Sequence, residues 1–482
     1  MNLKKIIIRN YKSIESLEVP ITRVNGSLTF SLLGVNESGK SSILKAISFI
    51  ERKDIVYPLD FHDKDKRIKV TYCYELDAKE IADLKLFLQE KFEAPATFTR
   101  QIEIKTLHLT KEFSSTNSAN ESKDVWIEFE REEITSYSYQ GGKIVPDNTA
   151  NTNIALNSFF NTALPEYFWK KVHTVVFWKS EPKYLITSAI NLQQFSGNPR
   201  GISIPLLNCF ELIGVQESRI ASKIAELNDP AAIYNLEQRL NDKVTEHISK
   251  VWYGHPILLK FKINNNHLSL LVEDEGVSYD AKVTSQRSDG FRQFISFLLT
   301  ISIESSNEKL NNTILLLDEP ETHLHPTAQL NLRDELLKIT RKREDNNLVF
   351  YATHSNYLID KSNLNRSFKV RKVDNVKTEL LKIPRTQTSY SEINFEIFDI
   401  PTNDYHNELY GFIEANDQSK LDALPKDKVW VREPTRRTFN VSLSTYIRHS
   451  IHHPENQLNR KFTEASLRKS IRILRKIKEE IS

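Results

Sequence analysis

The spacing of hydrophobic positions over the first fifty residues predicts two strands and a helix. The segments 4–14 (KKIIIRNYKSI) and 27–34 (SLTFSLLG) are rich in Ile and Leu and have the length and pattern of β-strands. In the segment 40–51 the apolar residues fall at positions 43, 44, 47 and 50, which is helical spacing. A loop with two glycines joins the second strand to this helix, so we expect a strand–loop–helix unit here.

The middle of the chain mixes both periodicities. Alternation of apolar and polar residues predicts strands at 67–76, 97–110 and 124–133, and helical spacing predicts a helix at 78–92. Residues 215–254 have the pattern of helices interrupted at Asp229-Pro230. Their apolar repeat is too short for a long coiled-coil arm.

Two uninterrupted apolar runs predict buried strands further along the chain. They lie at 312–320 (NTILLLDEP) and 347–355 (NLVFYATHS), and they alternate with helical patterns at 290–306 and 328–342. Alternating strands and helices favour a mostly parallel sheet with helices on its faces. We therefore predict an α/β fold.

Changes in pattern divide the chain into four regions. The expected boundaries give two lobes of one α/β domain at 1–62 and 260–402, a mixed α/β and helical insertion at 63–259, and a helical C-terminal region at 403–482. The last region contains one clear amphipathic helix. Its apolar stripe consists of Leu467, Ile471, Leu474, Ile477 and Ile481.

Composition favours a globular protein of a reducing compartment. Of 482 residues, 39% are hydrophobic and 27% charged, and no stretch approaches the roughly 20 apolar residues of a membrane span. The first residues have no signal-peptide pattern. The two cysteines, Cys73 and Cys209, are far apart, which argues against a disulfide framework or a cysteine zinc site. We expect a cytoplasmic protein without a membrane contact.

Positive charge is concentrated at the C-terminal end. Residues 421–482 hold 14 Lys and Arg against 7 Asp and Glu, whereas the whole chain has a net charge of only +3. Such a surplus favours contact with nucleic acid or with an acidic partner surface, and a solvated basic helix is an equally good interpretation.

The loop after the second strand carries a phosphate-binding motif. Gly34-Val35-Asn36-Glu37-Ser38-Gly39-Lys40-Ser41 matches G-x-x-x-x-G-K-[ST], the Walker A pattern. Its backbone N–H groups can surround phosphate oxygens, Lys40 can reach the β- and γ-phosphates, and Ser41 can bind Mg²⁺. The residues predicted to bind ATP are Gly34, Asn36, Glu37, Ser38, Gly39, Lys40, Ser41 and Ser42.

The apolar strand at 312–320 ends in two acidic residues. Asp318 is placed to hold Mg²⁺ and Glu319 to polarise the attacking water, which is the role of a Walker B strand end. His323 and His325 follow two residues apart without a nearby cysteine, so turn and packing roles are favoured over a zinc site.

Two weaker features complete the candidate site. Ser288, Asp289 and Gly290 precede a predicted helix, whose N-terminus can face an anion or can simply be capped. His354 ends the second apolar strand, where it can sense a γ-phosphate.

The order of GVNESGKSS, RSDGFRQF, LLLDEPETHLHP and ATHS resembles the ABC-type P-loop ATPase heads of the RecF and SMC class. It is most similar to the overcome-lysogenisation-defect-like ATPases of anti-phage defence. The resemblance implies that two heads enclose two ATP molecules, with Ser288, Asp289 and Gly290 of one subunit completing the other's site. A head-to-tail homodimer or larger oligomer follows. The glutamine usual in this family is not evident: Gln101 is a weak candidate, and Asp60 or Asp63 are alternatives.

The rest of the chain suggests what the ATPase controls. It has no evident coiled-coil arm and no nuclease motif of the Toprim kind, so it resembles PtuA, the ATPase subunit of Septu and of retron-linked defence systems, which works with a separate HNH nuclease. It also resembles the ATPase of PARIS systems. One alternative is a RecF-like DNA repair ATPase. Another is an ATP-controlled HEPN-type ribonuclease, since Arg448 and His453 match R-x4-H.

Overall fold

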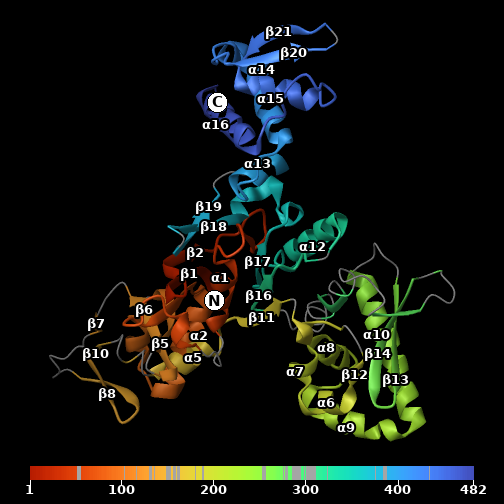
Figure 1. Cartoon of the computed structure of the whole chain (residues 1–482). Helices are drawn as coiled ribbons and strands as arrows, with labels where there is room; N and C mark the ends of the chain where they lie inside the picture. Colours follow the sequence, from red (N-terminus) through yellow and green to blue (C-terminus); the bar gives the residue numbers. More distant parts are fainter. Residues whose placement is uncertain are drawn as a thin grey trace. The chain divides into compact units, whose positions relative to one another are not determined.

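The structure is a computed structural model of the whole chain (Figure 1). It describes residues 1–482 except 51–55, 103, 115–116, 130–132, 135, 148–153, 156–158, 160–162, 180, 187–188, 252–256, 275, 277–280, 285–291, 293–294, 298, 300–310, 323, 375, 384–387, 434 and 482. The chain divides into two compact units. One comprises residues 1–360 and 365–383, and the other 361–364 and 384–482.

A six-stranded sheet forms the centre of the first unit. Its first four pairings are parallel and its last is antiparallel, in the order β11 (Thr174–Lys179), β16 (Thr313–Asp318), β17 (Leu348–Thr353), β3 (Thr29–Leu33), β18 (Ser367–Val373) and β19 (Lys377–Lys382). The mostly parallel sheet expected from the apolar runs is confirmed. Strand β11 lies within 63–259, so this region is not only an insertion but also supplies a strand to the central sheet.

The central strands are buried on both faces, which explains their apolar sequences. Alternate residues of β16 pack into different cores: Ile314 and Leu316 into one, Leu315 and Leu317 into the other. Helix α1 (Lys40–Ile47) covers the first face, and α12 (Pro326–Ile339) packs with Leu332 and Leu336 into the second core.

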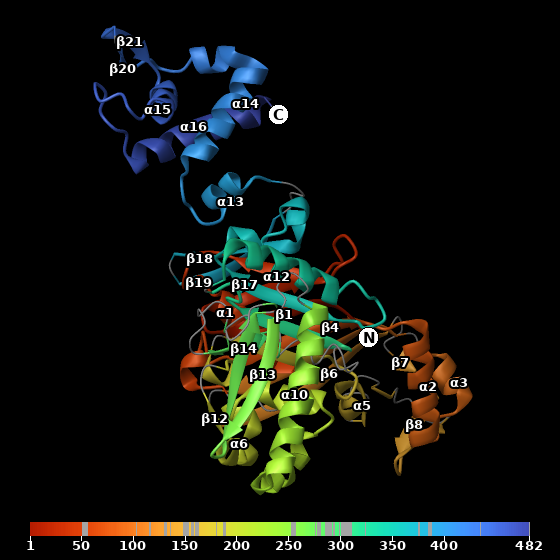
Figure 2. The same cartoon turned by 90° about the vertical axis from the view of Figure 1, so that its right-hand side faces the viewer.

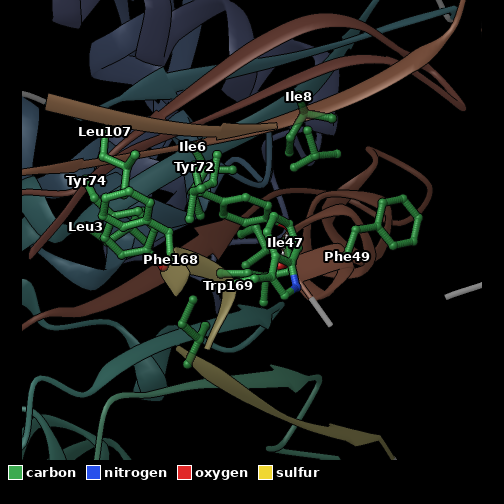
Figure 3. Packing of buried hydrophobic residues seen from close by; sticks show 14 of the residues in the cluster. Leu3, Ile6, Ile8, Ile47, Phe49, Tyr72, Tyr74, Leu107, Phe168 and Trp169 are labelled. Carbon is green, nitrogen blue, oxygen red and sulfur yellow. Dashed lines mark hydrogen bonds between the residues drawn. The ribbon is translucent and has the colours of Figure 1, made fainter. Parts of the chain in front are cut away.

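An antiparallel sheet closes the first core. Its order is β2 (Ile14–Pro20), β1 (Asn2–Tyr11), β4 (Ile68–Glu75), β5 (Ile104–Ser114) and β6 (Asn117–Phe129). Figure 3 shows its side chains meeting those of α1 and of the following turn: Ile6 and Ile8 of β1 and Tyr72 of β4 lie near Ile47 and Phe49. Helices α2 (Ala78–Phe92), α3 (Ala96–Arg100) and α5 (Pro165–Trp169) belong to the same part of the chain.

The second core continues into a helical region beside a small sheet. Here α10 (Pro230–Val251) lies along the hairpin of β13 (Ile257–Asn264) and β14 (His267–Asp274), as Figures 1 and 2 show. The shorter elements are β12 (Ile190–Asn191), β15 (Lys282–Val283), α6 (Leu192–Gly197), α7 (Pro199–Ile202), α8 (Ile204–Leu212) and α9 (Ile220–Ala225). The predicted break at Asp229-Pro230 is confirmed, because α10 begins at Pro230.

The second unit is mainly helical, as expected. It contains α13 (Tyr390–Glu396), α14 (Asn403–Asp422), α15 (Leu443–His452) and α16 (Glu464–Ile481), with a hairpin of β20 (Lys428–Arg432) and β21 (Arg437–Val441) that the sequence did not predict. The predicted stripe of α16 packs against α14, with Leu467, Ile471, Leu474 and Ile477 buried. The unit begins near residue 384, ahead of the expected boundary at 403.

Candidate nucleotide-binding site

The two glycines of the Walker A loop lie so close to neighbouring residues that there is no room for a side chain. Gly39 caps α1 with φ of 109°, a conformation that L side chains rarely adopt, and a Cβ there would collide with the hydroxyl of Thr378 on β19. A Cβ on Gly34 would collide with the carbonyl oxygen of Val370 on β18. The hairpin β18–β19 therefore packs directly on the loop, and only glycine fits at these two positions.

Lys40 is buried and lies among oxygen and nitrogen acceptors. Its Nζ is 3.0 Å from the carbonyl oxygens of Gly34 and Val35 and 3.0 Å from Nε2 of His354. Burial lowers the pKa of Lys40 to about 8, although Glu319 and Asp318 partly oppose this. The ammonium group thus lies at the centre of the loop, and no carboxylate of the described residues is in direct contact with it.

Ser41 and Asp318 meet although 277 positions separate them in the chain. The Ser41 hydroxyl donates to Oδ1 of Asp318 over 2.9 Å. Parallel pairing brings the ends of β3 and β16 to the same edge of the sheet, with β17 between them. A hydroxyl and a carboxylate at this distance are oxygen donors of the type that Mg²⁺ prefers.

Glu319 and His354 lie next to this pair. Glu319 has a left-handed backbone with φ of 52°, and its N–H donates to the carbonyl oxygen of Ala352 over 3.0 Å. Its Oε1 is 3.1 Å from Nε2 of His354. Burial, and then the positive charge of Lys40, lower the pKa of His354, so the imidazole is neutral at pH 7. A neutral Nε2 can hydrogen-bond with Lys40 or with Glu319, but not with both at once.

Sequence reasoning missed Glu321, which holds the turn that carries His354. Its buried Oε1 accepts from the Thr353 hydroxyl over 2.7 Å and from the His354 N–H over 2.8 Å. The Thr353 hydroxyl in turn accepts from the N–H of Ser355 over 2.9 Å. Burial raises the pKa of the Glu321 carboxyl. The only sequence signal was an acidic residue directly after a Walker B strand end.

The loop opens onto a cavity of about 600 Å³. Besides residues 36–42, Glu319 and His354, it is lined by residues that the sequence did not single out: Lys12, Ser13, Leu59, Phe61, His62 and Lys372. Gln101 is exposed at the end of α3, where its side chain donates to the carbonyl oxygen of Thr97, and does not line this cavity. Asp60 belongs to the lining segment 59–62, where it accepts from the N–H of Tyr57.

The other predicted site residues fall into three groups. Ser288, Asp289, Gly290 and His323 lie outside the described residues. His325 caps α12, with Nδ1 accepting from the N–H of Thr327, which agrees with a turn role. The Arg448 guanidinium lies over the Tyr410 ring and near Glu414, whereas His453 contacts Glu455 and lines a cavity of the second unit.

Two family models match the chain. The model described as "AAA ATPase domain" matches residues 1–194, and the one described as "AAA domain, putative AbiEii toxin, Type IV TA system" matches residues 216–360. Both describe an AAA domain, and between them they include the Walker A loop and the acidic end of β16. These two matches support an ATPase domain in this chain. None of the helices that the described residues form could cross a membrane.

Curated relatives of this ATPase match it over short segments. "Uncharacterized protein MJECL43" of Methanocaldococcus jannaschii is 25% identical over 122 residues, which are 24% of this chain and 31% of that protein. "Old nuclease" of Escherichia phage P2 is 32% identical over 81 residues, or 17% of this chain and 13% of that protein. The chain therefore spans less than a third of the length of either relative.

Solved structures of SMC heads align over most of the ATPase. The SMC head bound to the C-winged helix domain of ScpA aligns with 80% of this chain and 98% of its own, at 14% identity and a TM-score of 0.43. The SMC head domain from Thermotoga maritima aligns with 80% of this chain and 100% of its own, at 14% identity and a TM-score of 0.38.

Proposed function

We propose that this ATPase is an ABC-type head that binds and hydrolyses ATP with Mg²⁺, and that it controls a separate nuclease in anti-phage defence. The contact between Ser41 and Asp318 carries the proposal for the site. It joins the phosphate loop to the acidic strand end, the pairing that P-loop ATPases use to hold Mg²⁺. The bound ion would draw charge from the phosphates, and Ser41 and Asp318 would hold it.

Each of the other side chains has one task in this proposal. Lys40 exchanges its present carbonyl contacts for phosphate oxygens. Glu319 orients the attacking water and accepts its proton as the bond to the γ-phosphate forms and ADP leaves. His354, held by Glu321, donates a hydrogen bond to the γ-phosphate.

The defence role rests on the comparisons and the sequence resemblance. One matching family model names an AbiEii toxin of a toxin–antitoxin system, and one relative is named a nuclease. Both associations favour a head coupled to a toxic or nucleolytic effector, which we propose to be an HNH nuclease encoded nearby. Co-expression with that nuclease should yield a complex whose DNA cleavage changes with ATP, and loss of control in the Lys40→Ala variant would identify the head as the regulator.

The site itself is tested by turnover and by dimer formation. Glu319→Gln should keep ATP binding, slow hydrolysis by about a hundredfold or more, and accumulate an ATP-bound dimer in sedimentation experiments. Glu344→Gln, an equal change at an exposed position in the loop before β17, is the matched control and should hydrolyse ATP normally. Normal turnover by Glu319→Gln would refute the assignment of the general base.

Subunit mixing tests the proposal that Ser288, Asp289 and Gly290 act in trans. Lys40→Ala and Ser288→Ala should each be inactive alone. In a one-to-one mixture, random pairing gives one intact site in half of the dimers, so about a quarter of the parental turnover should return. A mixture as inactive as its components would mean that the site is completed within one chain.

A further inference from the structure

The second unit contains a cavity that the ATPase site does not use. It has a volume of about 580 Å³, within the range of about 300–1,000 Å³ that small-ligand sites occupy. The hairpin β20–β21 forms one wall, and the C-terminal end of α15 forms another. Trp430 and Phe439 are direct cross-strand partners in the hairpin, and Arg432 lies two residues along the strand from Trp430. These three side chains therefore share one face of the hairpin.

His449 on α15 and His453, the residue directly after α15, lie near the same aromatic residue. The His453 N–H donates to the carbonyl oxygen of His449 over 2.8 Å, so the last helical turn holds the two residues close together. Their rings are 5.3 and 6.4 Å from the ring of Trp430. The hairpin is tied to the loop after α15, because Asn456 and Asn459 both donate to the carbonyl oxygen of Val431 over 2.9 and 2.8 Å. The walls are thus held together by hydrogen bonds.

The cavity gathers three basic side chains, Arg432, His449 and His453. Within the described residues, neither the Arg432 guanidinium nor the His449 ring has a hydrogen-bond or ion-pair partner. His453 contacts the carboxylate of Glu455 over 3.3 Å, and Glu433 is the other carboxylate of the lining. Burial is the main cause that lowers the pKa of His449. An anion in the cavity could pair with the Arg432 guanidinium and accept a hydrogen bond from an imidazole N–H.

Phe439 adds a flat apolar surface to these basic groups. Its side chain is 44% exposed although it lies on the cavity face of the hairpin. Aromatic rings left open beside cations are the elements that bind bases of single-stranded nucleic acid, the ring by stacking and the cations through phosphate. The surrounding surplus of basic residues at 421–482 would attract such a ligand.

We propose that this cavity binds one phosphorylated nucleoside, with the base against Phe439 and the phosphate between Arg432, His449 and His453. The ligand can be the terminal nucleotide of a single strand or a free mononucleotide, which share this chemistry. The site lies in a different unit from the ATPase centre and goes beyond the proposed function. It also differs from an R-x4-H ribonuclease site, since Arg448 is turned toward Tyr410.

Binding by the full-length protein tests the proposal. Binding of a fluorescently labelled 12-nucleotide single strand is measured by anisotropy. Binding of uridine monophosphate is measured by calorimetry, and this ligand is chosen because its pyrimidine base differs from the adenine of ATP. Phe439→Ala and Arg432→Glu should each weaken binding about five- to hundredfold. Val429→Ala, on the other face of the same hairpin, and Arg472→Glu, on the exposed face of α16, are the matched controls and should change it less than twofold. Unchanged melting temperature and ATP turnover verify that all four variants fold.

Each outcome either supports or refutes the proposal that this cavity binds a nucleotide. Binding of the mononucleotide that Phe439→Ala abolishes supports a free nucleotide, and binding of the oligonucleotide alone supports a strand end. Equal losses of affinity in Arg432→Glu and Arg472→Glu would refute the cavity as the binding site and would indicate binding to a diffuse basic surface. The proposal would also be refuted if the protein bound neither the oligonucleotide nor the mononucleotide. Because Lys40→Ala leaves this cavity untouched, its oligonucleotide affinity should be normal even if the ATPase proposal fails.

Discussion

Replacing Glu321 by alanine should slow ATP hydrolysis without removing any residue proposed to touch ATP. The carboxylate accepts two hydrogen bonds, from the Thr353 hydroxyl and from the backbone N–H of His354. The Thr353 hydroxyl then accepts from the N–H of Ser355. Loss of Glu321 therefore releases the whole turn that carries His354.

The size of the effect follows from the two donors left without an acceptor. A buried group without a partner costs about 1–3 kcal/mol, so the pair costs about 2–6 kcal/mol unless the turn opens to water. If the turn opens to water, it avoids this cost. The closed conformation, in which His354 lies in the site, is then destabilised relative to the open one by at least about 2 kcal/mol. At about 1.4 kcal/mol per factor of ten, turnover should fall about 30-fold or more.

Steady-state ATPase rates on three variants test this reasoning. Glu321→Gln keeps an acceptor oxygen of the same shape and should stay within about threefold of the parent, whereas Glu321→Ala should not. A variant that combines Glu321→Ala with His354→Ala should be no slower than His354→Ala alone, because one residue acts through the other. Fully additive losses, or Glu321→Gln as slow as Glu321→Ala, would refute the positioning role.

Three further predictions concern the loop and the core. Gly39→Ala should weaken ATP binding at least about tenfold, whereas Gly26→Ala, also at positive φ but in open space, should cost only about 1 kcal/mol of stability and leave binding intact. Arg366→Met should lower the unfolding free energy by about 3–5 kcal/mol in denaturant titrations, because it removes the buried guanidinium that pairs with the Asp360 carboxylate and donates to the carbonyl oxygens of Val24 and Thr29. A smaller loss than for Arg371→Met, at the exposed pair with Glu379, would contradict this. Burial lowers the pKa of His173 from 6.5 to about 3, so the unfolded chain binds the extra proton between these values and stability falls as pH drops through that window; His173→Gln should show a smaller loss between pH 7 and pH 4.5, and an unchanged slope would count against the assignment.

The Walker A unit could be predicted from the sequence because it is local. Its strand, loop and helix are consecutive, and each is marked by its own periodicity or by glycine. The apolar runs of β16 and β17 were equally clear, since strands buried on both faces leave no polar alternation. The amphipathic stripe of α16 needed only its 3.6-residue period. The same local patterns did not predict the hairpin β20–β21, whose strands are only five residues long and whose β21 residues are all exposed or half-exposed.

Contacts between distant segments were decided only by the tertiary structure. Packing of Val370 and Thr378 against the glycines, the pairing of Ser41 with Asp318, and the support of His354 by Glu321 each join segments far apart in the chain. The sequence also did not show in which direction side chains point. Arg448 and His453 match a motif in sequence, yet Arg448 lies over Tyr410 and near Glu414 whereas His453, just after the end of α15, contacts Glu455 and lies near Trp430. A linear pattern records which groups are present, whereas folding determines which of them meet.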